Sequence, residues 1–390
     1  MTPGARISAM IEVLDSILVG VPTEKALTNW GRGNRFAGSK DRAAIRDLVF
    51  QAVRCRRSAG AWPKPISSRA WAIGSLQAND VELDNLFNNI GHAPTPLTND
   101  EITPFKSTDQ DTFDLQDWVI EELCNSYGVK KASKIAESLR HRAPICLRVN
   151  TQKATPIEVQ KALSNNMIDT IINPVCDTAL TVITNPRRVV LHDIYQKGWF
   201  ELQDAASQAV AMLIPGKGKV LDFCAGGGGK SLAVSARTGE VVFAHDANTK
   251  RMSEIEVRTL RGGHDIKIIL PDQIDDCAQF DSVFCDIPCS GSGAWRRSPE
   301  EKWKLTQAKI TEYQKLQRQI LIKAESLVKP GGTFSMITCS IFTSENQEQR
   351  DFLLNKFENL SVMAEAQHFP TKNNDGLYIV VFQKSSNPLN

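Results

Sequence analysis

The sequence lacks several features that mark whole classes of protein. Its longest apolar runs are short and interrupted by charge, so it predicts no membrane-spanning helix. Glu12 and Asp15 interrupt the only apolar stretch near the N-terminus, which argues against a secretory signal peptide. Nine cysteines, an odd number without regular spacing, do not suggest a disulfide framework. We therefore expect a protein of the reducing cytoplasm that is not embedded in a membrane.

Composition places the chain among ordinary globular proteins. It has 390 residues, of which 42% are hydrophobic and 23% are charged, and its formal net charge is +2. These values are close to the average for globular domains, which argues against extensive disorder and against a fibrous structure. At roughly 100–200 residues per domain, the length predicts two or three domains.

The small net charge hides an uneven distribution along the chain. Residues 1–70 contain twelve Lys and Arg against five Asp and Glu, whereas residues 71–120 contain nine acidic residues against Lys106 alone. This separation predicts separate surfaces, and a basic N-terminal module is one signature of nucleic-acid binding. A solvated helical face that binds nothing is the alternative. The cations that we expect to contact phosphates are Lys40, Arg42, Arg54, Arg56 and Arg57.

Hydrophobic periodicity predicts an N-terminal helical region. Apolar residues recur at three- and four-residue intervals over 7–18 and 45–53, and Ser39 is the expected N-cap of the second helix. The stretch 91–110 is rich in Pro, Thr and Asp, which is typical of a linker. After further helical sequence, residues 147–200 have the pattern of a small mixed α/β unit.

From about residue 217, short apolar segments alternate with amphipathic ones. This alternation is typical of a mostly parallel, doubly wound α/β sheet, in which ligands bind beyond the carboxyl ends of the strands. We therefore expect the functional residues directly after the strands. The expected strands are Lys219–Cys224, Glu240–Asp246, Ile266–Leu270, Phe280–Asp286, Thr333–Thr338 and Leu377–Gln383, with helices near 230–237, 248–261 and 301–328.

The segment LDFCAGGGGKS (221–231) joins the first of these strands to a helix through four glycines. Glycines let a ligand approach the backbone closely, and an open helix N-terminus can bind it. Asp246 ends the next strand, where a carboxylate can accept hydrogen bonds from a ribose diol. Together these features predict an adenosine-containing cofactor, and a tight turn that binds nothing is the alternative.

Two other nucleotide-binding motifs fit this loop less well. The residues Gly229–Lys230–Ser231 resemble the end of a Walker A motif, but Cys224 occupies the place of the glycine that this motif needs before its lysine. An NAD-dependent dehydrogenase is not excluded by the loop alone. The later motifs, however, offer thiols and no obvious machinery for hydride transfer.

The segment FDSVFCDIPCSGSGAWRRSPE (280–300) carries an acid and a thiol just past a strand. Asp286 and Cys289 are expected to project toward the cofactor, whereas Cys285 should point to the opposite face, into the core. Because Cys285 and Cys289 have no matching second pair, we expect no zinc site. Arg296 and Arg297 are candidates for phosphate contacts, or else surface residues without a role.

A second cysteine ends the later strand in GGTFSMITCSIFTSENQEQ (331–349), where Cys339 is followed by Ser340. A free cysteine is usually buried packing. Two cysteines at the carboxyl ends of adjacent strands are less easily explained in this way, which makes Cys289 and Cys339 candidates for chemistry.

These segments resemble the motifs of the RNA cytosine-5 methyltransferases of the RsmB and Sun type. LDFCAGGGGKS is similar to the cofactor loop D-x-C-A-x-P-G-G-K-T, DIPCSGSG to D-A-P-C-S-G-T-G, and ITCS to T-C-S. RRSPEEKW, LRVN (147–150) and LQDAASQ (202–208) also resemble family segments, and DRAAIRDLVFQAVR (41–54) resembles the NusB-like RNA-binding domain. The chain departs from the family's proline, threonine and alanine at Gly227, Ser231 and Ile287.

The resemblance implies a class I, Rossmann-like methyltransferase fold with a doubly wound sheet, preceded by an all-helical NusB-like domain and a small α/β RNA-binding unit. The implied domains are 1–100, 101–210 and 211–390. S-adenosyl-L-methionine is the implied cofactor and RNA, ribosomal RNA first, the implied substrate of a cytoplasmic enzyme, which we expect to be a monomer without a metal ion. A transfer-RNA methyltransferase and a non-catalytic RNA-binding assembly factor stay open as alternatives.

The resemblance also assigns roles to single residues. Cys339 is the implied nucleophile, whose addition to C6 of cytosine makes C5 nucleophilic, and Cys289 assists release of the product. Asp286 is expected to hold the edge of a base that has been flipped out or is already unpaired, and Lys230 to contact the cofactor or the base. The implied cofactor-binding residues are Cys224, Ala225, Gly226, Gly227, Gly228, Gly229, Lys230, Asp246, Arg251, Asp272 and Asp286.

Overall fold

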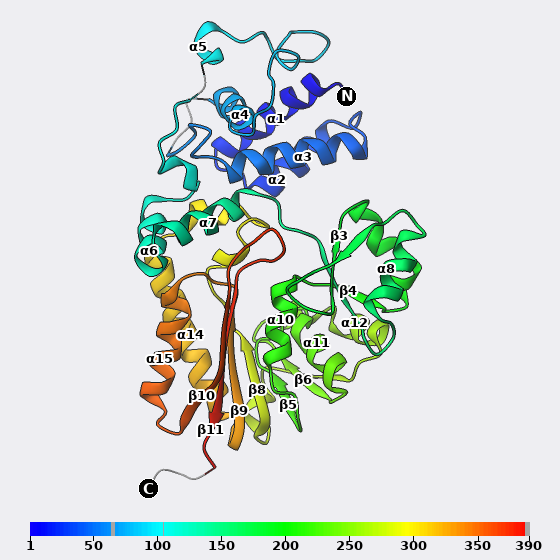
Figure 1. The fold of residues 1–390 in the computed structure, drawn as a ribbon, viewed down its shortest axis with the longest axis vertical. Coiled ribbons are helices and arrows are strands. Elements are labelled where there is room, and N and C mark those ends of the chain that lie inside the picture. Colours follow the sequence, from blue (N-terminus) through cyan, green and yellow to red (C-terminus); the bar gives the residue numbers. More distant parts are fainter. Residues whose placement is uncertain (64–66, 104, 387–390) are drawn as a thin grey trace. The chain divides into compact units, whose positions relative to one another are not determined.

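The structure is a computed structural model that describes residues 1–63, 67–103 and 105–386. The chain divides into two compact units, and each has its own apolar core (Figure 1). Within the described residues, no helix is long and apolar enough to cross a membrane. Unit 1 comprises Met1–Arg142 and Trp295–Lys304, and unit 2 comprises Ala143–Ala294 and Leu305–Asn390.

Unit 1 is helical, as the periodicity predicted. Thr2 caps α1 by accepting a hydrogen bond from the backbone N–H of Ala5 (3.2 Å), which satisfies one of the free donors of the first turn. The second long helix begins at Ser39 itself and Gly38 is its N-cap, so the prediction that Ser39 is the cap is wrong by one residue. The helices of unit 1 are α1 (Pro3–Leu18), α2 (Thr23–Gly33), α3 (Ser39–Arg54), α4 (Ser68–Gln77), α5 (Asn99–Ile102), α6 (Asp117–Tyr127), α7 (Val129–Arg140) and α13 (Glu301–Lys304), with a 3-10 turn η1 (Asp111–Phe113).

The basic and acidic blocks of the sequence pair with each other inside unit 1. Arg57 forms ion pairs with Asp111 and Asp117, with N–O distances of 2.8 and 2.6 Å. Arg69 likewise pairs with Glu101 at 2.7 Å. Folding therefore brings some opposite charges from the two blocks together, and the expectation of separate surfaces does not hold for Arg57 and Arg69.

Three of the cations that were predicted to contact phosphate are held by the protein itself. Arg54 is 7% exposed, and its guanidinium donates two hydrogen bonds to the carbonyl of Arg296 (3.1 and 2.9 Å). Burial lowers the pKa of Arg54 to about 10. Arg56 donates to the carbonyl of Ala61 (2.9 Å), and Arg57 forms the ion pairs described above. The predicted phosphate-binding role is wrong for these three residues.

The expected linker 91–110 contains one short helix, α5. The backbone N–H of Thr98 donates to the Glu101 carboxylate (3.0 Å), which holds the first turn of α5. Residue 104 lies outside the described residues. Residues 101–142 gather with the N-terminal helices, and the three-domain division with boundaries at 100 and 210 stays a prediction.

Unit 2 begins with a small antiparallel sheet of strand order β2-β3-β1-β4. Leu147, Leu180 and Phe200 of this sheet are fully buried against Val159 and Leu163 of α8. The sequence predicted such a mixed α/β unit. Its elements are β1 (Cys146–Val149), α8 (Pro156–Ser164), β2 (Thr170–Ile172), β3 (Ala179–Val182), η2 (Pro186–Leu191), α9 (Asp193–Gln196) and β4 (Phe200–Leu202).

The rest of unit 2 forms a seven-stranded sheet of order β10-β11-β9-β8-β5-β6-β7. Strands β7, β6, β5, β8 and β9 run parallel, and β11 and β10 add to them antiparallel. This is the predicted Rossmann-like, doubly wound α/β fold. Its strands are β5 (Val220–Asp222), β6 (Val242–His245), β7 (Ile266–Ile269), β8 (Phe280–Asp286), β9 (Val328–Thr338), β10 (Leu360–His368) and β11 (Leu377–Lys384).

Helices cover both faces of the large sheet (Figure 1). Leu321 of α14 packs on the face that carries Val283 and Cys285, whereas Val210 of α10 packs on the face that carries Phe284. Cys285 is fully buried, which confirms its predicted place in the core. The helices and 3-10 turns are α10 (Ala205–Leu213), α11 (Gly229–Thr238), η3 (Thr249–Met252), α12 (Ile255–Gly262), η4 (Ile274–Asp276), η5 (Ser292–Ala294), α14 (Gln307–Ser326), η6 (Thr343–Glu345) and α15 (Gln347–Lys356).

Three elements differ from the sequence prediction, and one of them is the helix expected near 248–261, which is divided into η3 and α12. Strand β10 was not predicted, because it lies at the edge of the sheet and carries few buried residues, so that no continuous apolar run marks it. The single helix expected over 301–328 is divided into α13 and α14, which belong to different units. The hydroxyl of Thr306 accepts from the N–H of Lys309 (3.2 Å) and begins α14 anew.

Candidate active site

The loop between β5 and α11 is held in a shape that only glycine adopts easily. Gly226 and Gly228 have φ angles of +52° and +76°, where other residues are strained. A Cβ atom on Gly226 would lie 2.9 Å from the Arg251 side chain, and one on Gly228 would lie 2.9 Å from Ile255. The helix that follows has no side-chain cap, so its first N–H groups are available to a ligand.

Residues in and next to the small sheet of unit 2 form hydrogen bonds with the end of this loop. Arg148 donates to the carbonyl of Gly229 (2.9 Å) and to the side chain of Gln203 (3.0 Å), and Gln203 donates to the same carbonyl (3.2 Å). Arg148 lies in the LRVN segment and Gln203 in LQDAASQ, to which the sequence assigned no role. These contacts fix the position at which α11 begins.

Asp246 is buried at the end of β6 and already accepts three hydrogen bonds. Its carboxylate accepts from the N–H groups of Gly226 and Asn248 (2.9 Å each) and from Arg251 (3.0 Å). A carboxylate has about four acceptor positions. One position is therefore left for a ribose hydroxyl, and a second becomes available only if Arg251, whose side chain is 54% exposed, moves aside.

The hydroxyl of Ser231 is not free to bind a magnesium ion, as the serine or threonine of a Walker A motif does. It is fully buried and donates to Asp222 (2.6 Å), the last residue of β5. Burial raises the pKa of Asp222 to about 7, the hydrogen bond from Ser231 opposes this rise, and the charge of Asp286 adds to it.

Lys230 and Asp286 form an ion pair beneath the carboxyl edge of the sheet, with an N–O distance of 2.6 Å. Burial is the largest influence on the pKa of Lys230 and would lower it, but the charge of Asp286, its hydrogen bond and the charges of Cys339 and Asp222 together outweigh burial, and the pKa is raised. Two of the predicted catalytic residues thus contact each other.

The two candidate cysteines lie side by side. Strands β8 and β9 run parallel with Asp286 opposite Ile337, so Cys289 and Cys339 leave the sheet at the same edge. Their Sγ atoms are 3.4 Å apart. The contact with Cys339, together with burial, raises the pKa of the Cys289 thiol well above its ordinary value.

One residue of this site was missed in the sequence. Glu345 is fully buried, and its carboxylate accepts hydrogen bonds from residues of both cysteine-bearing turns, from Ser290 after Cys289 and from Ser340 after Cys339. A glutamate six residues after Cys339, within the segment already singled out, was the available signal. Nothing in its spacing showed that it would be buried.

The remaining predicted residues are less closely engaged. Asp272 lies exposed in the turn after β7, and Ala225 is buried in the loop. Ile287 is 2% exposed and packs in the core. Arg296 is 1% exposed, so its predicted phosphate contact is wrong, whereas Arg297 is exposed.

Within the ranges that the structure describes, no group of three or more His, Cys, Asp and Glu is arranged to hold a metal ion.

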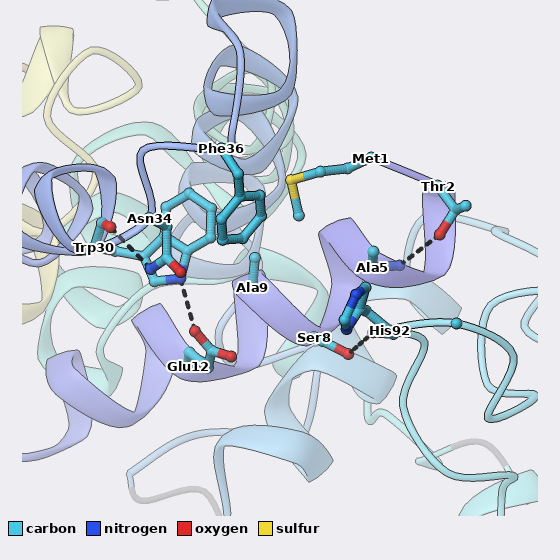
Figure 2. A pocket seen from close by; sticks show the side chains of 11 residues that line it. Met1, Thr2, Ala5, Ser8, Ala9, Glu12, Trp30, Asn34, Phe36 and His92 are labelled. Carbon is cyan, nitrogen blue, oxygen red and sulfur yellow. Dashed lines mark hydrogen bonds between the residues drawn. The ribbon is translucent and has the colours of Figure 1, made fainter.

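A separate hollow of about 550 Å³ lies in unit 1 (Figure 2). Trp30 and Phe36 line it, and Trp30 is held by a hydrogen bond from its indole N–H to Glu12 (2.7 Å). On another wall, the hydroxyl of Ser8 donates to the backbone carbonyl of His92 (2.7 Å). Phe36 is 73% exposed, so an aromatic face is open to solvent there.

Comparison with known families gives two adjacent matches. Residues 210–383 match the model of the 16S rRNA methyltransferase RsmB/F family, and residues 116–189 match the ferredoxin-like domain of RsmF/B-like methyltransferases. Together the two matches cover more than half of the chain.

Curated relatives agree with these matches. The ribosomal RNA small subunit methyltransferase B of Vibrio cholerae is 35% identical over 240 residues, which is 60% of this chain and 55% of that protein. The protein of the same name from Cronobacter sakazakii is 34% identical over 228 residues, covering 56% and 53%. The chain thus spans about half the length of the curated relatives it matches.

Two solved structures share the fold. The crystal structure of PH0851 superposes with a TM-score of 0.74 at 20% identity and covers 98% of this chain and 99% of its own. NSun6 from Pyrococcus horikoshii, solved with SFG, gives a TM-score of 0.62 at 16% identity and covers 70% of this chain and 99% of its own. At this level of identity the likeness extends to the fold alone.

The first prediction concerns Asp246. Replacement by Asn removes the charge that strengthens its hydrogen bonds, so Asp246→Asn should weaken binding of S-adenosylmethionine by about 2 kcal/mol. Calorimetric titration measures this change. Asp276→Asn, which removes an exposed carboxylate of the same domain, is the control and should leave the affinity unchanged. Equal affinities for Asp246→Asn and wild type would refute the assignment.

The second prediction concerns the pH dependence of stability. Because the pKa of Asp222 is raised from 3.8 to about 7, the folded state binds its proton more tightly than the unfolded state. As pH rises from 4 to 7, wild type should lose stability relative to Asp222→Asn, by at most about 4 kcal/mol. Urea unfolding of both proteins at pH 5, 6, 7 and 8 tests this. Parallel curves would mean that Asp222 is ionised throughout.

Proposed function

Because this chain belongs to the RsmB/F family of rRNA methyltransferases, we propose that it methylates C5 of a cytidine in RNA through a covalent bond between Cys339 and C6. The observation that carries the proposal is the contact of the Cys289 and Cys339 thiols beside the ion pair of Lys230 and Asp286. Two thiols, an ammonium group and a carboxylate at one edge of the sheet provide the groups that this reaction needs.

The loop after β5 fits S-adenosylmethionine. Gly226 and Gly228 leave room for a ligand against the backbone, the N-terminus of α11 is open, and Asp246 has an acceptor position left for a ribose hydroxyl. The bound cofactor supplies the electrophilic methyl group. Lys230 lies in the first turn of α11, and its ammonium group contacts Asp286, which supports a cofactor loop close to the turn that carries Cys289.

Cys339 is assigned the attack on C6. Its thiolate forms a bond to C6, and the electron pair of the C5–C6 double bond becomes available at C5 for the methyl group. After methylation, a base takes the C5 proton, the double bond re-forms and the bond between Cys339 and C6 breaks.

Cys289 is assigned to this release step. Its raised pKa keeps it a thiol at neutral pH, in contact with the sulfur that leaves C6. We assign to Asp286 the binding of the exocyclic amine of the base, because a carboxylate can accept hydrogen bonds from that amine. Its side chain is 37% exposed and therefore accessible to a base.

RNA is expected to contact unit 1 at a surface that shares only Lys40 with the cations that the sequence indicated. Arg32 in the last turn of α2, Arg35 after it and Lys40 in the first turn of α3 are exposed, and they flank in sequence Phe36, whose exposed ring lines the hollow in Figure 2. Cations beside an open aromatic face suit an unpaired nucleotide, whose phosphate and base both find a partner.

The third prediction separates the roles of the two cysteines. Cys339→Ala should abolish methylation and any covalent adduct with RNA. Cys289→Ala should still form the adduct but stall at elimination, leaving a protein–RNA species that survives denaturing electrophoresis. One gel with both variants, cofactor and RNA tests this.

Three outcomes of that gel are distinguishable. An adduct with Cys339→Ala instead of Cys289→Ala would exchange the two roles. No adduct and full activity from either variant would mean that both are packing residues, and the covalent mechanism would fail.

The fourth prediction concerns salt dependence. The triple variant with Arg32, Arg35 and Lys40 replaced by Ala should lower the slope of log K against log salt for single-stranded RNA by about 2. The matched control replaces three exposed lysines of α7 by Ala, namely Lys130, Lys131 and Lys134. Equal changes in both variants would show that net charge alone acts and that this surface is not an RNA site.

The proposed function itself is tested by bisulfite sequencing of total RNA from cells with and without the gene. Loss of one protected cytidine in ribosomal RNA supports the proposal, and restoration by wild type but not by Cys339→Ala assigns it to this chain. Loss of a protected cytidine in transfer RNA instead would identify transfer RNA as the substrate. No lost position would refute the activity.

A further inference from the structure

The two cysteine-bearing turns need something that holds them together. Each turn extends past the paired residues of its strand, where one backbone hydrogen bond, from the N–H of Gly293 to the carbonyl of Cys339 (2.9 Å), still joins the two turns. Cys289 and Cys339 are not covalently linked, so the sulfur–sulfur distance of 3.4 Å also depends on side chains that connect the turns.

Glu345 supplies this connection with one carboxylate. One oxygen accepts from the backbone N–H of Ser290 (2.9 Å) and from Gln317 (3.0 Å). The other accepts from the hydroxyl of Ser290 and from that of Ser340 (2.6 Å). Ser290 directly follows Cys289, and Ser340 directly follows Cys339.

Neighbouring hydroxyls extend the connection. The hydroxyl of Ser292 hydrogen-bonds those of Ser290 and Ser340 (3.1 Å each) and accepts from the N–H of Ile341 (2.9 Å). The amide of Asn346 donates to the carbonyl of Ser340 (3.0 Å). Both turns are thus tied to one buried polar network with Glu345 at its centre.

We propose that Glu345 is a positioning residue that holds the turns of Cys289 and Cys339 in contact, so that attack and release take place on the same base. This inference rests on the proposed function. Glu345 is not itself a catalytic base, because four donors use its acceptor positions and its side chain is fully buried. Its negative charge also contributes to the raised pKa of the Cys289 thiol.

The test uses Glu345→Gln in the full-length protein. Glutamine has the same shape, but one of its two oxygens is replaced by an NH₂ group, which cannot accept the serine hydroxyls. The turnover number for RNA methylation should fall about 100-fold, the loss typical of a misplaced reacting group, while the KM for RNA and the affinity for S-adenosylmethionine change less than about 2-fold.

A matched control separates this effect from general loss of stability. Glu325 is also a buried carboxylate of unit 2, 5% exposed and paired with Lys384 (2.8 Å), but Lys384 contacts Val328 at the start of β9, not its carboxyl end. Glu325→Gln should keep the wild-type turnover number whatever it does to the melting temperature.

A second measurement reports the thiol contact directly. Dibromobimane becomes fluorescent when it bridges two adjacent thiols. The part of the fluorescence that is lost in the Cys289→Ala variant comes from the pair of Cys289 and Cys339. This signal should form at least 5-fold more slowly in Glu345→Gln than in wild type or Glu325→Gln. If Glu345→Gln does not fold, Ser340→Ala, which removes only one hydroxyl of the network, should show the same slower bridging to a smaller degree.

The outcomes distinguish this inference from the proposed function. Wild-type turnover and wild-type bridging in a folded Glu345→Gln protein would overturn the positioning role. If wild type itself methylates no RNA, the proposed function fails, and the bridging rates alone decide whether Glu345 holds the turns together.

Discussion

The parallel pairing of β5, β8 and β9 is the constraint on which the site depends. Asp222 lies opposite Phe284 and Asp286 opposite Ile337, so the three strands end at one edge of the sheet. Lys230, Cys289 and Cys339 follow these ends, and Lys230 contacts Asp286 while the two thiols contact each other, although these residues are far apart in the chain. A shift of register in either pair would separate the thiols from each other or from the ammonium group.

Four carboxylates around this edge are distinguished by what surrounds them. Burial raises the pKa of Asp222 toward neutrality, whereas Asp286 is paired with the ammonium of Lys230. Asp246 is held mainly by backbone N–H groups, and Glu345 by hydroxyl, amide and backbone donors. The same chemical group thus has four different surroundings, which differ in burial and in the hydrogen-bond donors that hold it.

In unit 1 the same principle acts on arginine. A guanidinium can be buried if carbonyl or carboxylate oxygens satisfy its donors, as those around Arg54 and Arg57 do. Such residues stabilise the helical unit and are not available to bind nucleic acid. Other cations of the unit stay exposed, among them Arg32, Arg35 and Lys40.

The sequence by itself determined the class of fold, because alternating apolar segments specify a doubly wound sheet, and it indicated candidate site residues in the glycine loop and cysteine motifs that follow the strands. The edge strand β10 escaped prediction because few of its residues are buried. Only the tertiary structure decided which charges remain exposed and that Glu345 joins the two cysteine turns. The physical reason is that burial and hydrogen bonding depend on partners distant in the chain, which local sequence patterns do not specify.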